Sequence, residues 1–226
     1  MVSVQDVLDR LKSQARPDQL KGMARYGMAV DRRLGVSVRD MRLLVRDIGT
    51  NHNLALNLWQ TGIAEAQIVA SMIADPAALT EEQMEDWVQD VDSWDVCDQV
   101  CMNLYDKSPL AWKKIYDWSE REEEFVRRTA FALAARLASH DRKADDSRFI
   151  ELLSVVARGA SDDRNMVKKA VNWALRSIRK RNRLLHEAAM STAREIQRQD
   201  SRSARWIASR AIRELESEAV QSRIRK

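Results

Sequence analysis

Hydrophobic residues recur every three to four positions along most of the chain, which is the period of amphipathic helices. The segment 164–181 shows this best, because it has two faces roughly 200° apart at about 100° per residue. Its apolar face consists of Val167, Val171, Ala174 and Ile178. Its opposite face sets a tryptophan among cations, at i, i+4, i+7 and i+11: Lys169, Trp173, Arg176 and Lys180.

Residues typical of helix starts punctuate the pattern. Ser37 precedes the segment 38–48 as an N-cap, and Thr80 with Gln83 forms a capping box. Ser108 followed by Pro109 predicts another helix with proline in its first turn. Continuing in this way predicts about a dozen helices of roughly 10–18 residues with short turns and no strand.

The sequence therefore predicts an all-α protein. Only 6 Gly and 3 Pro occur in 226 residues, as in helical chains. About six helix pairs of roughly 35–40 residues match HEAT-like or armadillo-like repeats, which stack into a solenoid curved around a concave binding face. We expect one helical-repeat domain over residues 1–226, with a compact helical bundle as the alternative.

Other features limit the class of protein. The longest apolar runs, such as 131–135, are too short to cross a membrane, and the first residues predict an amphipathic helix rather than a signal core. The two cysteines, Cys97 and Cys101, lie one helical turn apart, with the three histidines distant in sequence, so no zinc signature is present. We expect a monomer in a reducing cytoplasm, without metal or cofactor.

Charge is distributed unevenly. The net charge is +4, but residues 164–226 hold 17 Lys/Arg and 6 Asp/Glu, whereas residues 75–124 hold 15 Asp/Glu and 4 Lys/Arg. The basic end would attract a polyanion. An anionic membrane fits less well, because no helix there pairs its cations with a wide exposed apolar face.

The tryptophan within the 164–181 segment favours nucleic acid as that polyanion, since an indole adds contact with sugars and bases. The alternative is that Trp173 covers a neighbouring helix while the cations are solvated.

The segment 91–101, VDSWDVCDQVC, is the second candidate. Ser93 is expected to cap a helix on which Trp94 and Asp98 share one face. The opposite face is apolar: Cys97, Val100, Cys101 and Leu104. A carboxylate beside an indole can stabilise a developing cation or act as a base. Alternatively, Asp95 complements the helix N-terminus, Asp98 is solvated and Trp94 belongs to the core.

The segment 124–140 is the third candidate for a functional site. Arg128 and Arg136 lie two turns apart, displaced by roughly 80°, and guanidinium groups suit phosphates. As an alternative, Arg127 and Arg128 pair with the acidic run 122–124.

The order SWDVCD, RRTAFAL and KKAVNWALR resembles the AlkD-type DNA alkylation repair glycosylases, which are built of HEAT-like repeats. The resemblance is collinear from about residue 23 to about residue 183, and includes MARYGMAVDRRLGVSVRDMRLLVRDI and LWQTGIAEAQIVASMI. This sequence departs from the family pattern at Ser93, where the family usually has a second tryptophan, and at Cys97, where an apolar residue is typical.

This resemblance implies roles for four residues. Trp94 and Asp98 match the family's W-D-x-x-D segment, Arg128 its arginine, and Trp173 its second tryptophan. In that family the indoles pack on the sugar-phosphate backbone around the lesion, and the aspartate stabilises the sugar cation as a cationic N3- or N7-alkylated purine departs. The base is not extruded into a pocket, unlike in most base-processing enzymes.

The chemistry agrees, because an alkylated purine already carries positive charge and leaves without a strong acid. A single carboxylate beside aromatic walls is then enough to stabilise the oxocarbenium-like sugar and to deliver water. We therefore expect a cofactor-free DNA N-glycosylase acting on duplex DNA, with Arg128, Arg136, Lys169, Arg176 and Lys180 on the backbone. The alternatives are a non-catalytic helical-repeat module that binds DNA or RNA, and a protein-binding solenoid whose acidic half recruits a basic partner.

Overall fold

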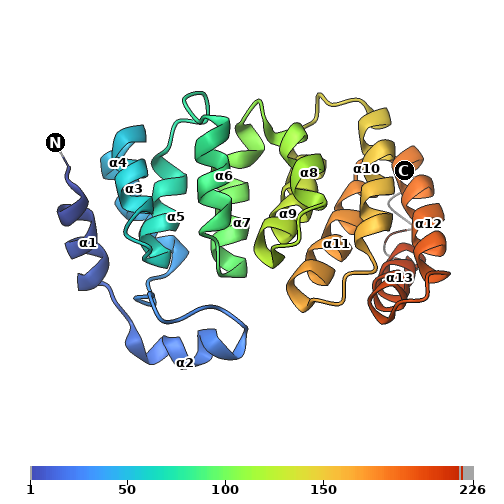
Figure 1. Cartoon of the computed structure of the whole chain (residues 1–226), viewed down its shortest axis with the longest axis horizontal. Helices are drawn as coiled ribbons and strands as arrows, with labels where there is room; N and C mark the ends of the chain where they lie inside the picture. Colours follow the sequence, from blue (N-terminus) through green and yellow to red (C-terminus); the bar gives the residue numbers. More distant parts are fainter. Residues whose placement is uncertain (1, 219, 221–226) are drawn as a thin grey trace. The chain divides into compact units, whose positions relative to one another are not determined.

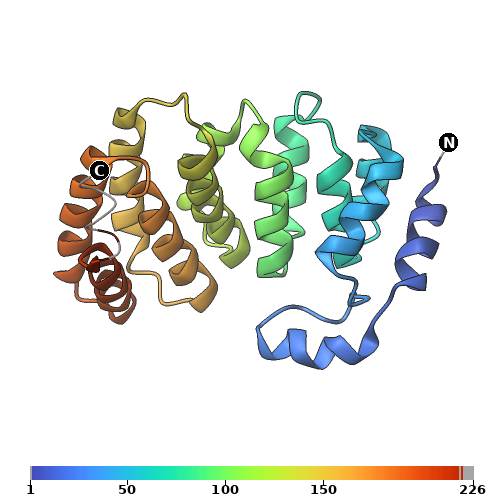
Figure 2. The ribbon, with the colours of Figure 1, turned by 180° about the vertical axis from the view of Figure 1, so that it is seen from behind.

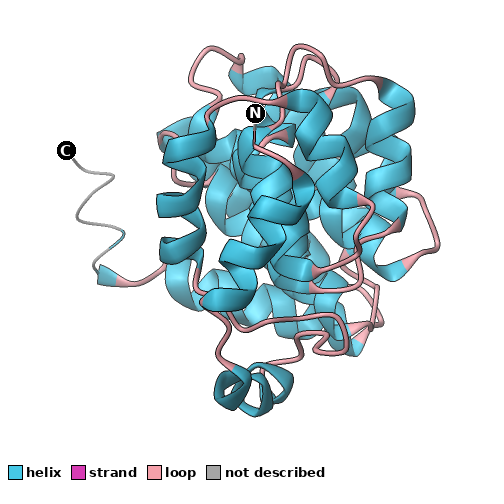
Figure 3. Ribbon diagram, turned by 90° about the vertical axis from the view of Figure 1, so that its left-hand side faces the viewer, coloured by secondary structure: helices cyan, strands magenta, loops and turns pink. Residues whose placement is uncertain are grey.

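The computed structural model describes residues 2–218 and 220, and in this part of the chain it contains thirteen α-helices, one short 3-10 helix and no strand (Figures 1 and 3). The all-helical prediction is thus confirmed. The chain forms two compact units, Met1–Leu110 and Ala111–Lys226. That residues 1–226 act as one domain stays a prediction.

The first unit is arranged around one central helix. It contains α1 (Val4–Ser13), α2 (Pro17–Arg25), α3 (Val38–Ile48), α4 (His52–Trp59), α5 (Ala64–Ile73), α6 (Glu81–Gln89), α7 (Trp94–Asn103) and η1 (Tyr105–Lys107). Every residue of α5 except Met72 is buried, and α5 packs against α1, α3, α4 and α7. Because α5 has so little polar surface, it supplies much of the core of this unit.

Two stacked indoles join α4 to α6. The rings of Trp59 and Trp87 lie 4.1 Å apart at an interplanar angle of 3°. The indole Nε1 of Trp59 donates to Asp90 Oδ2 at 2.9 Å, so its polar atom is satisfied at the edge of the stack.

The buried carboxylate of Glu65 holds the loop before α3. It accepts backbone N–H bonds from Leu34, Gly35 and Val36 at 2.9, 2.7 and 3.3 Å. Gly35 has a φ of +81°, and a Cβ there would lie 2.4 Å from the Arg16 carbonyl oxygen, so only glycine fits. This loop is therefore held by the Glu65 carboxylate on one side and packed closely against the Arg16 backbone on the other.

The second unit pairs long helices. It contains α8 (Ala111–Ser119), α9 (Glu124–His140), α10 (Asp146–Gly159), α11 (Asn165–Ile178), α12 (Arg183–Gln197) and α13 (Arg202–Leu215). The most extensive packing joins α9 to α11, and α12 packs on both α10 and α13 (Figure 2). A Cβ at Gly159 would lie 2.2 Å from the ring of Phe131, so glycine permits the close approach of α10 to α9.

The predicted caps at Ser37 and Thr80 are confirmed. Ser37 accepts from Asp40 N, and the capping box of Thr80 with Gln83 is present. The prediction at Ser108 is wrong, because α8 begins only at Ala111. Ser108 instead ends the 3-10 turn, with its N–H bonded to the Tyr105 carbonyl and its Oγ accepting from Leu110 N.

None of the helices in the described part of the chain has both the length and the apolar character needed to span a bilayer. Within the same residues, no group of three His, Cys, Asp or Glu side chains is placed to hold a metal ion.

Candidate nucleic-acid interface

The N-terminus of α7, in the first unit, is held by a hydrogen-bond network rather than by an N-cap. Ser93 occupies the cap position, but its side chain makes no capping bond, which corrects the sequence prediction. Its Oγ donates to Asp95 Oδ1 at 2.6 Å and accepts from Ala29 N at 3.2 Å. These two partners, one local and one from a distant loop, compete successfully with the backbone of α7 for the hydroxyl group.

Arg33 is the centre of this network. Its Nη1 and Nη2 donate to the two carboxylate oxygens of Asp95 at 2.6 and 2.9 Å, and its Nε donates to the Ala29 carbonyl at 2.7 Å. The Arg33 side chain is only 3% exposed. Asp95 thus lies in the first turn of α7, as expected, but its carboxylate is bound in a bidentate ion pair that ties the 29–33 loop to α7.

The same loop orients the predicted site tryptophan. Trp94 is half-buried, and its Nε1 donates to the Tyr26 carbonyl at 3.0 Å. Asp98 lies one turn further along α7 and is also half-buried. The opposite face is confirmed as core: Cys97, Val100, Cys101 and Leu104. The structure therefore places a fixed indole and a carboxylate on the accessible side of one helix.

In the second unit, Arg128 is 5% exposed and its Nη1 donates to the Met166 carbonyl at 2.8 Å, in the first turn of α11. This arginine links α9 to α11. Arg127 lies 3.6 Å from Asp162, a different acidic partner from the run 122–124 proposed as the alternative. Arg136, two turns along α9 from Arg128, is half-buried.

Asp162 organises the loop before α11. Arg164 binds it in a bidentate manner, with Nε–Oδ1 at 3.0 Å and Nη2–Oδ2 at 2.6 Å. Burial raises the pKa of Asp162, but the Arg164 hydrogen bonds and charge outweigh it, so the pKa is lowered on balance. The carboxylate therefore stays ionised and fixes the start of α11.

The two faces of α11 follow the sequence prediction only in part. The apolar face is confirmed, since Val167, Val171, Ala174 and Ile178 are fully buried. On the other face Trp173 is half-buried, while Lys169 and Lys180 are exposed and form no ion pair within the described residues. Arg176 pairs with Glu214 of α13, which also pairs with Arg179, so its charge is largely compensated.

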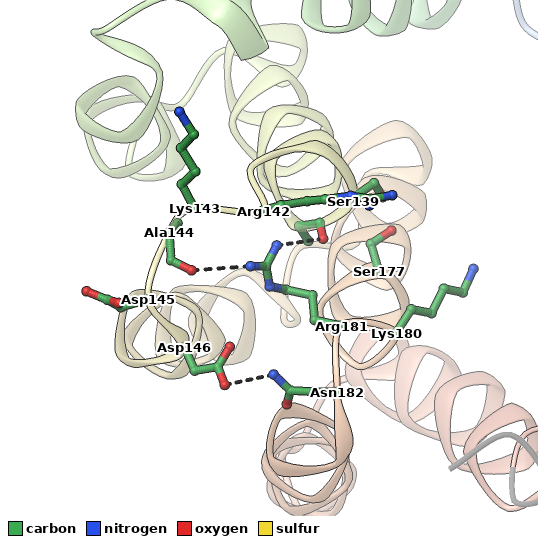
Figure 4. A pocket seen from close by; sticks show the side chains of 11 residues that line it. Ser139, Arg142, Lys143, Ala144, Asp145, Asp146, Ser177, Lys180, Arg181 and Asn182 are labelled. Carbon is green, nitrogen blue, oxygen red and sulfur yellow. Dashed lines mark hydrogen bonds between the residues drawn. The ribbon is translucent and has the colours of Figure 1, made fainter. Parts of the chain in front are cut away.

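An open groove of about 780 Å³ lies at the C-terminal ends of α9 and α11 (Figure 4). Arg181 forms part of its wall, with its guanidinium donating to the carbonyls of Ala138, Asp141 and Ala144 and lying 4.0 Å from the Phe149 ring. The groove is also lined by Lys180 and by two exposed cations that the sequence prediction missed, Arg142 and Lys143. They belong to the charged turn DRKADD, which reads as an ordinary solvated loop.

The helices packed in pairs and their buried apolar stripes are those of a HEAT-like repeat protein. Residues 7–215 match the family model of DNA alkylation repair enzymes, so the chain belongs to that family.

A solved structure agrees with this fold. It is described as a new family of proteins related to the HEAT-like repeat DNA glycosylases with affinity for branched DNA structures. It is 21% identical, with a TM-score of 0.78, over 94% of this chain and 95% of that one. A designed armadillo repeat protein aligns at 16% identity over 92% of this chain and 99% of that one, with a TM-score of 0.40. No curated protein matches the sequence significantly.

Proposed function

We propose that this protein is a DNA N-glycosylase that hydrolyses the N-glycosidic bond of cationic N3- and N7-alkylated purines in duplex DNA. The observation that carries the proposal is the pair Trp94 and Asp98 on one face of α7, in a chain of the DNA alkylation repair family. The Tyr26 carbonyl fixes the indole of Trp94, and the Arg33–Asp95 ion pair fixes the start of the helix. No cofactor is needed, because the alkylated base leaves as a neutral molecule.

Each step of the chemistry has a group to support it. Departure of the base leaves an oxocarbenium-like sugar, which the carboxylate of Asp98 stabilises before it helps to deliver water. Trp94 supplies an apolar wall whose orientation is set by its bond to the Tyr26 carbonyl. Such a fixed arrangement reduces the reorganisation required during the reaction.

Binding is assigned to the second unit. Lys169 and Lys180 offer charges that phosphates can neutralise, and Trp173 adds contact with the sugar. Arg176 and Arg136 extend this set, with Arg176 held by Glu214 in the protein alone. We assign Arg128 to the same site, where its buried guanidinium keeps α11 in register with α9.

Base release tests the proposal. Purified protein is incubated with methylated duplex DNA, and released 7-methylguanine and 3-methyladenine are measured, with unmethylated DNA as the blank and a working family member in parallel. We expect release of at least one base. If the family member frees bases and this protein frees neither, the glycosylase proposal is wrong.

The second candidate is a DNA-binding protein without glycosylase activity. It is favoured by the solved relative described as having affinity for branched DNA. Tight binding to a branched junction together with no base release would select this function.

A further inference from the structure

The last described helix, α13, has a pattern that the proposed site does not use. Its buried face is made of small and aliphatic residues: Ala204, Ile207, Ala208, Ala211 and Leu215. On another face, Trp206 is surrounded by three cations that lie within roughly 40° of it around the helix axis. These are Arg202, Arg210 and Arg213, all of them exposed. The arrangement resembles the face of α11 that contains Trp173, and we call it the α13 stripe.

Cations hold the indole of Trp206 at the surface. The Lys168 Nζ lies 5.2 Å from the ring centroid, and the Arg210 guanidinium carbon lies 5.3 Å from it. Trp206 is half-buried, whereas Ala204, Ile207 and Ala208 on the other face of α13 are fully buried. Lys168 belongs to α11, so two helices contribute charge around one ring.

The charges of the α13 stripe are not compensated. Glu214 is bound by Arg176 and Arg179, and Asp200 by Arg205. Within residues 2–218 and 220, none of Lys168, Arg202, Arg210 and Arg213 forms an ion pair. Such uncompensated charge repels itself and is stabilised by a polyanion.

The direction of Lys168 separates the α13 stripe from the face of α11 that contains Trp173. Lys168 and Lys169 differ by about 100° around α11, and it is Lys168 that meets Trp206. From Arg202 to Arg213 the stripe is about 16 Å long at 1.5 Å per residue, enough for roughly five base-pair steps.

We propose that the α13 stripe is a second DNA-binding surface, which holds the backbone of a second duplex segment while the α11 face holds the first. A branched junction supplies both segments at once. The arginines bind phosphates and the indole packs on a sugar. An acidic peptide would pair with the arginines but would not need the indole. The inference rests on the DNA-binding part of the proposed function and not on base release.

Binding is measured by fluorescence anisotropy from 50 to 200 mM salt, with a linear duplex of about 12 base pairs and a three-way junction with arms of that length. The test variants are Arg202→Ala/Arg210→Ala and Trp206→Ala. The matched control is Arg205→Ala, on the same helix but about 100° from Trp206 and paired with Asp200. Both arginines of the double variant are exposed, so their removal should leave the fold intact.

We expect the double variant to lose about tenfold in junction affinity, because a second attachment is lost, and about two units of salt slope. The double variant should bind the linear duplex with wild-type affinity. Arg205→Ala should bind both DNAs with wild-type affinity and salt slope. Trp206→Ala should lower junction affinity with the salt slope unchanged.

Three results would overturn the inference: no effect of the double variant, equal losses on duplex and junction, or binding of the stripe to phosphatidylserine vesicles without any DNA effect. Base release from the linear methylated duplex is recorded in parallel. A wild type that releases no base removes the glycosylase proposal, while the junction comparison still decides the role of α13.

Discussion

At the scale of single residues, the clearest prediction concerns Asp98. If its carboxylate stabilises the sugar cation, Asp98→Asn should abolish base release while the amide keeps the shape of the side chain. Affinity for duplex DNA should be unchanged or slightly raised, because a charge that repels phosphate is removed. Activity within a few-fold of the wild type would exclude Asp98 from the site, and an unfolded variant would show a structural role instead.

Arg33 offers a second test, because its ion pair with Asp95 ties the loop that bonds the Trp94 indole to the start of α7. Asp95→Asn leaves the buried guanidinium of Arg33 unpaired and should cost about 3–5 kcal/mol in the free energy of unfolding. The double variant Arg33→Met/Asp95→Leu removes both charges and should recover most of that stability.

Base release separates positioning from stability. It should stay low in the double variant, because the loop that bonds the Trp94 indole loses its ion pair with α7 and is held less firmly. Recovery of stability and base release together would show that the ion pair has no positioning role.

Ser93 shows what sequence cannot predict at this scale. Its position before α7 indicates an N-cap, and the position is right. The hydroxyl bonds Asp95 and Ala29 instead, and Ala29 lies 64 residues away in sequence. A local pattern contains no information about such a competitor. Arg33 was missed for the same reason, since a lone arginine in a loop reads as a solvated charge.

At the scale of helices, two cations of α11 are expected to contribute unequally to DNA binding. Lys169→Ala should weaken binding equally on all duplex sequences and reduce the salt slope by about one unit, because one phosphate contact is lost. Arg176→Ala should reduce it less, since Glu214 already compensates that charge in the protein alone. Salt titrations of the two variants test this order, and equal slopes would contradict it.

Trp173→Ala on the same helix should behave differently. It removes apolar contact with the sugar, so base release should fall while the salt slope of binding stays constant. If the variant loses stability yet remains fully active once folded, the half-buried indole belongs to the core and not to the site.

Helix faces were the most predictable part of the molecule. The buried sides of α7 and α11 follow from apolar spacing alone, because burial of one stripe is what stabilises such helices. Pairing between charges was not predictable. Arg176 was expected on DNA, yet its partner Glu214 lies on another helix.

At the scale of the whole chain, the count and length of the helices predicted the HEAT-like class, because steady helix lengths and short turns favour stacked pairs over a compact bundle. The division into two compact units was not predicted. It depends on contacts between distant helices, and these have no counterpart in local periodicity.

The last prediction concerns stability against pH and depends on buried groups of the second unit. Burial lowers the pKa of His186 below its ordinary value of 6.5, and the nearby Arg179 lowers it further. A lowered pKa in the folded state means that the stabilising contribution is present above 6.5 and is lost as pH falls through the folded value.

Glu214 and Asp162 add a second acidic step. Burial raises the pKa of each, but the arginine hydrogen bonds lower both on balance, below ordinary values of 4.5 and 3.8. Urea unfolding at pH 8, 5.5 and 4 should therefore show a first loss of stability below 6.5 and a second below about 4.5. His186→Leu should remove the first loss and leave the second, whereas His140→Gln, a change at an exposed histidine, should alter neither. A first loss that persists in His186→Leu would assign it to another group.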